Sequence, residues 1–317
     1  MCSSDLAKDP LALAEAIAQI HPRRSPSGYL HAVVGLYPSR RVIRRHTLDL
    51  KRVREPDYCK EVCAQQFRIE QEKHALALID AADGSDFEPE KSTRKEVVFC
   101  GLPFEDAETE QQALINSGLY PERMELGSVA LLGALSRILA ASGNKAPVLV
   151  LEMGADMTHS YIVSGAGIEA SRPIPQGIDA MVPVVQKELG LNDEEAARKL
   201  FHANTFDFTG MGPQLTRRLL KELQSSIGFF EVQTGQSVGQ VVITQLAPHM
   251  AWLEGSIAGG LGLSPLRFDA VAWLQAEEGV SVPDALAPTL AEPRWFGLLA
   301  LMAHHSSAHA VLAEEKK

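Results

Sequence analysis

The stretch that most constrains the fold of this 317-residue chain is a run of three apolar segments separated by two turns that contain glycine. Val148–Leu151 has the pattern of a short buried strand, Ser160–Val163 of a second strand running back, and Ile168–Arg172 of a third. A glycine just past a buried strand can adopt a positive φ and lets backbone N–H groups face an anion. The pattern is therefore that of either a phosphate-binding turn or an ordinary polar hairpin.

Residues of the first turn supply the chemistry that the phosphate interpretation needs. Glu152 stands at the strand end, where a carboxylate could hold a hydrated Mg²⁺, and the Thr158 hydroxyl could hydrogen-bond a phosphate oxygen. Gly154, Ala155 and Asp156 fill the turn between them. On this spacing alone, both interpretations stay open.

The turn resembles the second phosphate motif of the actin-like ATPase superfamily, usually Asp-x-Gly-x-x-x-Thr, and the wider chain resembles its PilM branch from type IV pilus assembly. The similarity runs over roughly residues 11–305 and keeps the motifs in order. Beyond the turn, it rests on five segments: VVGLYPSRRVIRRHTL (33–48), NSGLYPERMELGSVALLGAL (116–135), ASRPIPQG (170–177), LNDEEAARKL (191–200) and LLKELQSSIGFFEVQTGQ (219–236).

The resemblance implies an α/β chain with an actin-like (ribonuclease H-like) two-domain fold and an inserted α+β subdomain. The implied divisions are a first domain (7–29 and 120–144, incomplete at its N-terminus), the inserted subdomain (30–119), a second domain (145–292) and a helix returning to the first domain (293–310). The cofactor would be ATP with Mg²⁺, and Glu152 would be the metal ligand. The implied cofactor-binding residues are Glu152, Gly154, Ala155, Asp156, Thr158, Gly177 and Thr244.

Departures from the family pattern indicate a degenerate nucleotide site. The adenosine motif is an apolar strand ending in two glycines, but here Val241–Thr244 is followed by Gln245 and Leu246, whose side chains fill space and lose the glycine's freedom of φ. Glu152 replaces the usual Asp. A family acid and lysine that approach the nucleotide are replaced by Ala197 and Leu200.

The first phosphate motif expected by the resemblance, Asp-x-Gly-x-x-Ser on an opening strand, is not found in this sequence. Residues 2–6, CSSDL, are what the end of a common sequencing adapter encodes when translated. We therefore expect Met1–Leu6 to be an assembly artefact and the native N-terminus to be missing. The alternative is an ordinary start of the chain.

Periodicity gives a coarse map of the elements. We expect a helix over 9–20, a hairpin of strands 29–36 and 42–48, a helix over 56–70, strands 75–79 and 96–102, and a helix over 106–117. Asn192 with Glu195 has the spacing of a capping box for a helix that ends at His202. Gly212-Pro213 is expected to open a long amphipathic helix.

Composition and charge exclude some classes of function. No apolar run approaches the roughly 18–20 residues that a membrane span needs. The four cysteines do not make a disulfide framework and are interpreted as thiols of a reducing cytoplasm. Residues 1–54 hold ten Lys/Arg against four Asp/Glu, but without a nucleic-acid-binding motif, so nucleic acid is not an expected partner. This basic segment is either a solvated sheet edge or a patch for an acidic partner or membrane surface.

Two function hypotheses follow. The first is a cytoplasmic scaffold, peripheral to the inner membrane, that binds the N-terminal peptide of a PilN-like inner-membrane protein and couples the pilus platform to cytoplasmic motors. The peptide groove would involve residues 33–48 and the inserted subdomain. The second is a working ATP-binding switch or slow ATPase. An actin-like component of a type II secretion system and a sugar kinase are less favoured, the kinase because no Asp base stands in a recognisable kinase motif.

Overall fold

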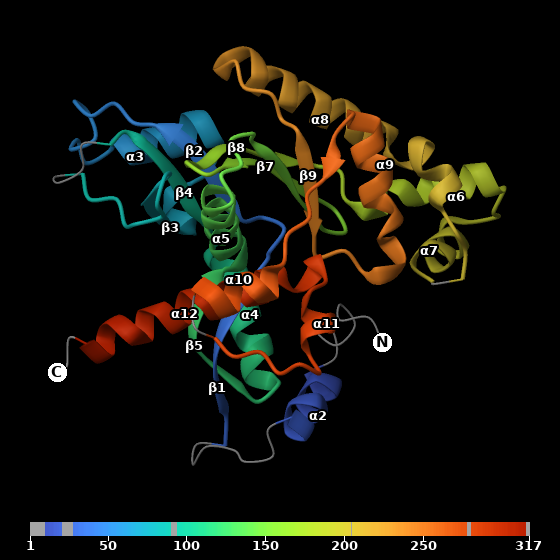
Figure 1. The fold of residues 1–317 in the computed structure, drawn as a ribbon, viewed down its shortest axis with the longest axis horizontal. Helices are drawn as coiled ribbons and strands as arrows, with labels where there is room; N and C mark the ends of the chain where they lie inside the picture. Colours follow the sequence, from blue (N-terminus) through green and yellow to red (C-terminus); the bar gives the residue numbers. More distant parts are fainter. Residues whose placement is uncertain (1–9, 21–27, 90–93, 204, 278–279, 315–317) are drawn as a thin grey trace. The chain divides into compact units, whose positions relative to one another are not determined.

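The computed structural model describes residues 10–20, 28–89, 94–203, 205–277 and 280–314. The chain divides into two compact units, of which unit 1 comprises residues 1–79 and 86–129 and unit 2 comprises residues 80–85 and 130–317 (Figure 1). Residues 1–6, expected to be an artefact, lie outside the described residues.

Unit 1 contains a two-stranded parallel sheet. Strand β1 (Leu30–Leu36) pairs along its whole length with β5 (Leu119–Leu126), and the register shifts by one residue beside Pro121. Proline has no N–H to donate, which makes a regular ladder impossible at that point. Helix α2 (Pro10–Ile20) precedes β1, and α4 (Phe104–Asn116) precedes β5 and packs against it.

A separate three-stranded sheet makes the second part of unit 1. Its order is β2 (Val42–Thr47), β4 (Glu96–Pro103) and β3 (His74–Asp80), and β2 and β4 are antiparallel. A helix, α3 (Tyr58–Val62), runs into a π-helical turn over Cys63–Phe67. Side chains from both elements pack on the sheet, with Tyr58, Val62, Cys63, Val97 and Phe99 in the core.

The predicted pairing of β1 with β2 is wrong. Both strands exist, but β1 pairs with β5 and β2 pairs with β4, in different sheets. The apolar run from Ala32 to Leu36 is typical of a strand in a parallel sheet, whereas the connection through Tyr37-Pro38 redirects the chain into the second sheet. The basic residues that follow are engaged within unit 1: Arg40 bonds to Glu105 and Asp106, and the buried Arg41 donates to the carbonyls of Tyr37 and Pro38.

Unit 2 is built on a five-stranded mixed sheet in the order β10-β9-β6-β7-β8. The strands are β6 (Val148–Met153), β7 (Thr158–Ser164), β8 (Gly167–Ile174), β9 (Gln240–Thr244) and β10 (Ser264–Pro265). β6, β7 and β8 form an antiparallel meander, as the sequence predicts, and β9 and β10 continue the sheet in parallel with β6.

Alternate residues of the central strand face the helices. Leu149 and Leu151 of β6, with Ile243 of β9, belong to one core cluster with the helices α6 to α9. Figure 1 shows α8, the longest of them, running beside α9. The helices of unit 2 are α6 (Val182–Leu189), α7 (Glu194–His202), α8 (Gly212–Thr234), α9 (Trp252–Leu261), α10 (Ala270–Glu277), α11 (Ala287–Leu290) and α12 (Phe296–Glu314), and α5 (Gly127–Ala141) begins in unit 1 and continues into unit 2.

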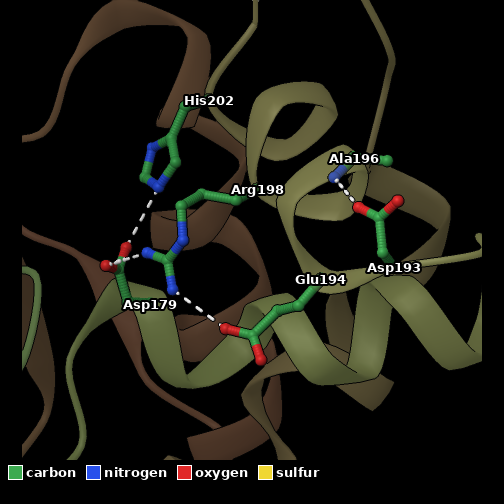
Figure 2. Close-up of polar contacts among 6 residues, drawn as sticks. All are labelled: Asp179, Asp193, Glu194, Ala196, Arg198 and His202. Carbon is green, nitrogen blue, oxygen red and sulfur yellow. Dashed lines mark hydrogen bonds and ion pairs between the residues drawn. The ribbon is translucent and has the colours of Figure 1, made fainter.

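The long helix is confirmed, whereas the capping box is off by one residue. All of the predicted apolar stripe of α8 is buried, including Leu215, Leu219 and Leu223. The N-cap of α7 is Asp193 rather than Asn192, and its carboxylate accepts from the Ala196 N–H at 2.7 Å (Figure 2). Asp and Asn cap helices about equally well, so the residue type does not decide whether residue 192 or 193 becomes the N-cap. The backbone conformation decides it. Within the described residues, no helix combines the length and apolarity that a membrane span requires.

Candidate functional site

The predicted phosphate turn is an exposed loop between two fully buried strands. β6 ends at Met153, and Gly154, Ala155 and Asp156 are exposed before β7 begins at Thr158. The Gly154 N–H donates to the Met157 carbonyl at 2.8 Å and closes the turn. Gly154 does not adopt a positive φ. A Cβ there would lie 3.2 Å from the Met157 oxygen, so close approach is the constraint on this position.

Gly177 brings a distant segment against this turn. The Ile178 N–H donates to the Gly154 carbonyl at 2.9 Å, and the Asp179 N–H donates to the Ala155 carbonyl at 3.0 Å. A Cβ on Gly177 would lie 2.1 Å from the Ala155 oxygen. The structure thus brings four of the predicted residues, Gly154, Ala155, Asp156 and Gly177, to one exposed loop.

Thr158 has a structural hydrogen bond at this loop. Its side chain is fully buried, and its hydroxyl donates to the Gln176 carbonyl at 2.6 Å. The bond ties the start of β7 to the segment that leads into Gly177. The hydroxyl proton that a phosphate oxygen would accept is therefore committed to the backbone.

Glu152 lies in a row of buried polar side chains across the sheet. It pairs in register with His159 on β7 and Thr244 on β9, and residues opposite each other in a ladder share a face. Glu152 and Thr244 are each 1% exposed. The Tyr161 hydroxyl, two residues along from His159, donates to Glu152 Oε2 at 3.3 Å. Glu152 is thus a carboxylate held inside the protein.

The predicted adenosine-binding strand ends in an unusual backbone conformation. Gln245 has φ of 67°, the left-handed region that glycine adopts without strain and that costs other residues about 1–2 kcal/mol. Leu246 packs against the core cluster of unit 2. The buried Thr244 Oγ1, just before the turn, has no hydrogen-bond partner among the described residues. Gln245 thus adopts the backbone conformation that glycine favours, although it carries a side chain.

A polar cluster that the sequence analysis missed lies beside Gly177. Asp179 accepts from Arg198 and, at 3.0 Å, from His202 Nε2, and Arg198 also bonds to Glu194 at 3.1 Å (Figure 2). The hydrogen bonds that Arg198 donates to Asp179 and, to a smaller extent, to Glu194 raise the pKa of Arg198. The signal was present in the sequence, because Glu194, Arg198 and His202 are spaced four apart on one helical face. The cluster fastens α7 to the segment after Gly177.

A pocket of about 420 Å³ in unit 2 is lined in part by Leu246. Its lining is mainly apolar, with Ile243, Leu246, Leu266, Phe268 and Phe296. Arg267 stands at this pocket, bound to Glu254 through both of its terminal nitrogens. Among the described residues, no group of three or more His, Cys, Asp or Glu side chains is placed to hold a metal ion.

Comparison with known proteins places the fold. No protein-family profile matches the chain, and no curated protein sequence matches it. A solved structure of the PilM-PilN type IV pilus biogenesis complex is similar at 19% identity and a TM-score of 0.64, covering 93% of this chain and 85% of that chain.

Two other structures are more distant. The ethanolamine utilization protein EutJ from Carboxydothermus hydrogenoformans has 16% identity, covers 62% of this chain and 61% of that chain, and has a TM-score of 0.39. The apo pSK41 ParM protein has 12% identity, covers 64% and 60%, and has a TM-score of 0.36. These two scores are too low to add to the assignment. The mixed sheet of unit 2, the three-stranded sheet of unit 1 and the similarity over 93% of the length show that this chain has a PilM-like, actin-like α/β fold.

Proposed function

We propose that this chain is a cytoplasmic scaffold of a type IV pilus assembly machine, peripheral to the inner membrane, which binds the N-terminal peptide of a PilN-like membrane protein. The supporting observation is the fold similarity to the protein of a PilM-PilN complex over 93% of the chain. Binding an extended peptide needs grooves and pockets but no hydrolysis, which is compatible with a degenerate nucleotide site.

The surface that we assign to the peptide lies in unit 1, where the connection after β1 contacts the start of α4. Arg40 bonds to Glu105 and Asp106 in the first turn of that helix. Phe104, the first residue of α4, is 48% exposed. An exposed aromatic ring beside fixed charges is the kind of anchor that peptide-binding surfaces use.

The connection is also fixed from its other end. A Cβ on Gly127, at the start of α5, would lie 2.3 Å from the Tyr37 ring, so the ring rests directly on the helix terminus. Arg41 holds the carbonyls of Tyr37 and Pro38. A connection that is held in this way is preorganised, and binding to it costs less conformational entropy than binding to a mobile loop.

Binding of a fluorescent synthetic peptide from the N-terminus of the PilN-like protein of the same organism tests the proposal. We expect saturable binding to the wild-type chain that weakens at least about tenfold in Phe104→Ala, since removal of a hot-spot anchor typically costs about 2 kcal/mol or more and about 1.4 kcal/mol is tenfold in affinity. Phe229→Ala is the matched control, because Phe229 is an exposed phenylalanine of unit 2 (67% exposed). No binding to the wild type, or equal losses in both variants, would contradict the proposal.

The alternative function is an ATP-dependent switch. It is favoured by one observation, the retained left-handed turn at Gln245 where the family places glycine. In that case the exposed N–H groups around Ala155 and Asp156 would face phosphates, and Glu152 would be the metal ligand. Against it stand the buried position of Glu152 and the internal hydrogen bond of Thr158.

Nucleotide and peptide binding can be separated with one variant. Gly154→Asp places a negative charge in the exposed turn, on a side chain whose Cβ would lie 3.2 Å from the Met157 oxygen. The variant is expected to abolish any binding of Mg-ATP while leaving peptide binding intact. Calorimetric titration with Mg-ATP on the wild type decides whether the switch exists. Loss of both ligands together in a folded Gly154→Asp variant would mean that the two sites are coupled.

A further inference from the structure

The outer face of α8 in unit 2 carries a continuous stripe of exposed side chains. The apolar residues from Leu215 to Phe230 point to the core of the unit. On the opposite side of the helix, residues that are three or four positions apart share one face. From Arg218 to Val232 this face is about 21 Å long, at 1.5 Å per residue. Its members, all exposed, are Gln214, Arg218, Lys221, Ser225, Phe229 and Val232.

The N-terminal half of this outer face is basic. Arg217 lies beside Arg218 and Lys221, and all three side chains are exposed. Among the described residues, none of these three side chains has a hydrogen bond or an ion pair. Glu222, the acid next to Lys221 in the chain, is bound to Arg172 at 2.6 Å. The face therefore presents three positive charges that no described carboxylate neutralises.

The C-terminal half of the same face is apolar. Phe229 is 67% exposed and Val232 is 87% exposed. The helix ends at Thr234, and the residues that follow Val232, QTGQS (233–237), are polar without charge. An aromatic ring and a branched side chain that stand in water gain free energy when an apolar phase covers them. One helix face thus joins a cationic end to an apolar end.

The shape of this face favours a lipid bilayer over a protein as its partner. The face is the convex side of one helix, and the pocket described above is lined by residues outside α8. Protein interfaces place their anchors in well-packed pockets of complementary shape. A fluid bilayer follows a convex surface and offers anionic headgroups directly above an apolar layer. Since the whole chain has a net charge of −10, attraction to an anionic surface has to come from a local patch.

We propose that the outer face of α8 binds the surface of an anionic lipid bilayer. Arg217, Arg218 and Lys221 contact headgroup phosphates, and Phe229 and Val232 enter the boundary between headgroups and acyl chains. This contact lies in unit 2 and goes beyond the peptide contact proposed for unit 1. Failure of either proposal leaves the other standing.

Co-sedimentation of the 317-residue chain with lipid vesicles tests the proposal. We expect binding to vesicles of phosphatidylglycerol and phosphatidylethanolamine at low salt, and loss of that binding at high salt because the headgroup charge is screened. Vesicles of phosphatidylcholine alone should bind the chain at least about tenfold more weakly. Absence of binding to the anionic vesicles, or equal binding to both kinds, would overturn the proposal.

Removal of the three positive charges tests the basic half. Replacing Arg217, Arg218 and Lys221 together by alanine, which favours the helix, should weaken binding to the anionic vesicles at least about tenfold. The matched control replaces three other exposed cations by alanine, namely Lys51, Arg54 and Lys145. Equal losses in the two triple variants would show that net charge matters and α8 does not.

Substitutions of one ring test the apolar half. Phe229→Ala should weaken vesicle binding about threefold or more, because less apolar area enters the boundary. Phe229→Trp should strengthen it, since tryptophan prefers this boundary, and a folding defect would not increase binding. Phe104→Ala should leave vesicle binding unchanged, which separates this face from the peptide surface. Unchanged vesicle binding in both Phe229 variants would overturn the insertion of the ring.

A cross-link decides between lipid and protein in the cell. A photo-reactive amino acid in place of Ser225, which lies between the two halves, should form cross-links to phospholipid. Cross-links to a protein without any to lipid would overturn the proposal and assign the outer face of α8 to an acidic protein partner.

Discussion

Gly177 lies against the Ala155 carbonyl so closely that a Cβ at position 177 would be 2.1 Å from the oxygen. Ala155 O accepts from the Asp179 N–H, and Gly154 O accepts from the Ile178 N–H. The contact therefore fixes the shape of the exposed loop between β6 and β7. It also explains why glycine is needed here without a positive φ, which Gly177 does not have.

We expect Gly177→Ala to lower the free energy of unfolding by about 2 kcal/mol, because the added methyl group must push one backbone segment away and lengthen two hydrogen bonds. Urea denaturation measures the change. Gly210→Ala is the control, since no heavy atom lies within 4 Å of the added Cβ. It should change stability by no more than about 0.5 kcal/mol. Equal effects in the two variants would show that the contact is not a constraint.

Because the backbone at Gln245 is left-handed, we expect a β-branched residue at this position to destabilise the protein. Gln245→Gly should leave stability within about 0.5 kcal/mol of the wild type, because relief of strain is offset by the entropy of glycine in the unfolded chain. Gln245→Val should cost about 1–2 kcal/mol, because a branched Cβ fits this region poorly. The same two substitutions at Gln236, exposed and without a positive φ, give the baseline. If the free energies of unfolding of the Val and Gly variants differ no more at Gln245 than at Gln236, the turn leaves the left-handed conformation when valine is introduced.

Much of the fold could be predicted from the sequence, because its signals are local. The meander β6–β8 and the helix α8 follow from apolar periodicity and glycine placement, and they were found. The pairing of β1 with β5 was not, since a parallel partner about ninety residues away leaves no local signal in either strand.

The site was predictable only at the level of its positions. The loop residues Gly154, Ala155, Asp156 and Gly177 do come together. The packing of η3 (Ile178–Met181) and α7 decides which group accepts the hydrogen bond of Thr158 and which side chains contact Asp179. This packing has no local signal in the sequence. The assigned roles of Glu152 and Thr244 toward a nucleotide stay predictions.

The cluster around Asp179 should hold α7 in place. Asp179→Asn keeps the shape but removes the charge that accepts from both Arg198 and His202, so we expect a lower melting temperature and faster hydrogen exchange in Glu194–His202. The difference from the wild type should shrink at high salt, because the contacts are partly exposed. Asp156→Asn, in the exposed turn, is the control for loss of one carboxylate. A salt-independent effect would point to packing instead of charge.

The three described cysteines should react in a fixed order. Burial raises the pKa of Cys59, that of Cys63 to about 11 and that of Cys100 to about 12, so few thiolates exist at neutral pH. Cys59 is the only one of the three that is not fully buried. Alkylation at pH 7.5 with peptide mapping should therefore modify Cys59 first and Cys100 only when the protein unfolds. Early modification of Cys100 in folded protein would contradict the packing of β4.

Acid should destabilise unit 1 through His46. Burial lowers the pKa of His46 below its usual 6.5, although the charge of Glu96 acts in the opposite direction. A histidine with a lower pKa in the folded state binds fewer protons folded than unfolded, so its contribution to stability is complete above about pH 6.5 and falls as the pH drops below that value.

The His46 ring contacts the rings of Phe67 and Phe99 edge-on, with ring centroids 5.9 and 6.3 Å apart. The phenylalanine of His46→Phe should fit the same site, and this variant should lose less stability than the wild type between pH 7.5 and pH 5. Urea denaturation, with unfolding monitored by hydrogen exchange of the amides of β2, measures the loss. His74→Phe, on another strand of this sheet, is the comparison, because His74 bonds to the Glu70 carbonyl and is not itself in the core cluster. If His46→Phe and the wild type lose stability in parallel as the pH falls, the acid sensitivity of this sheet comes from other groups.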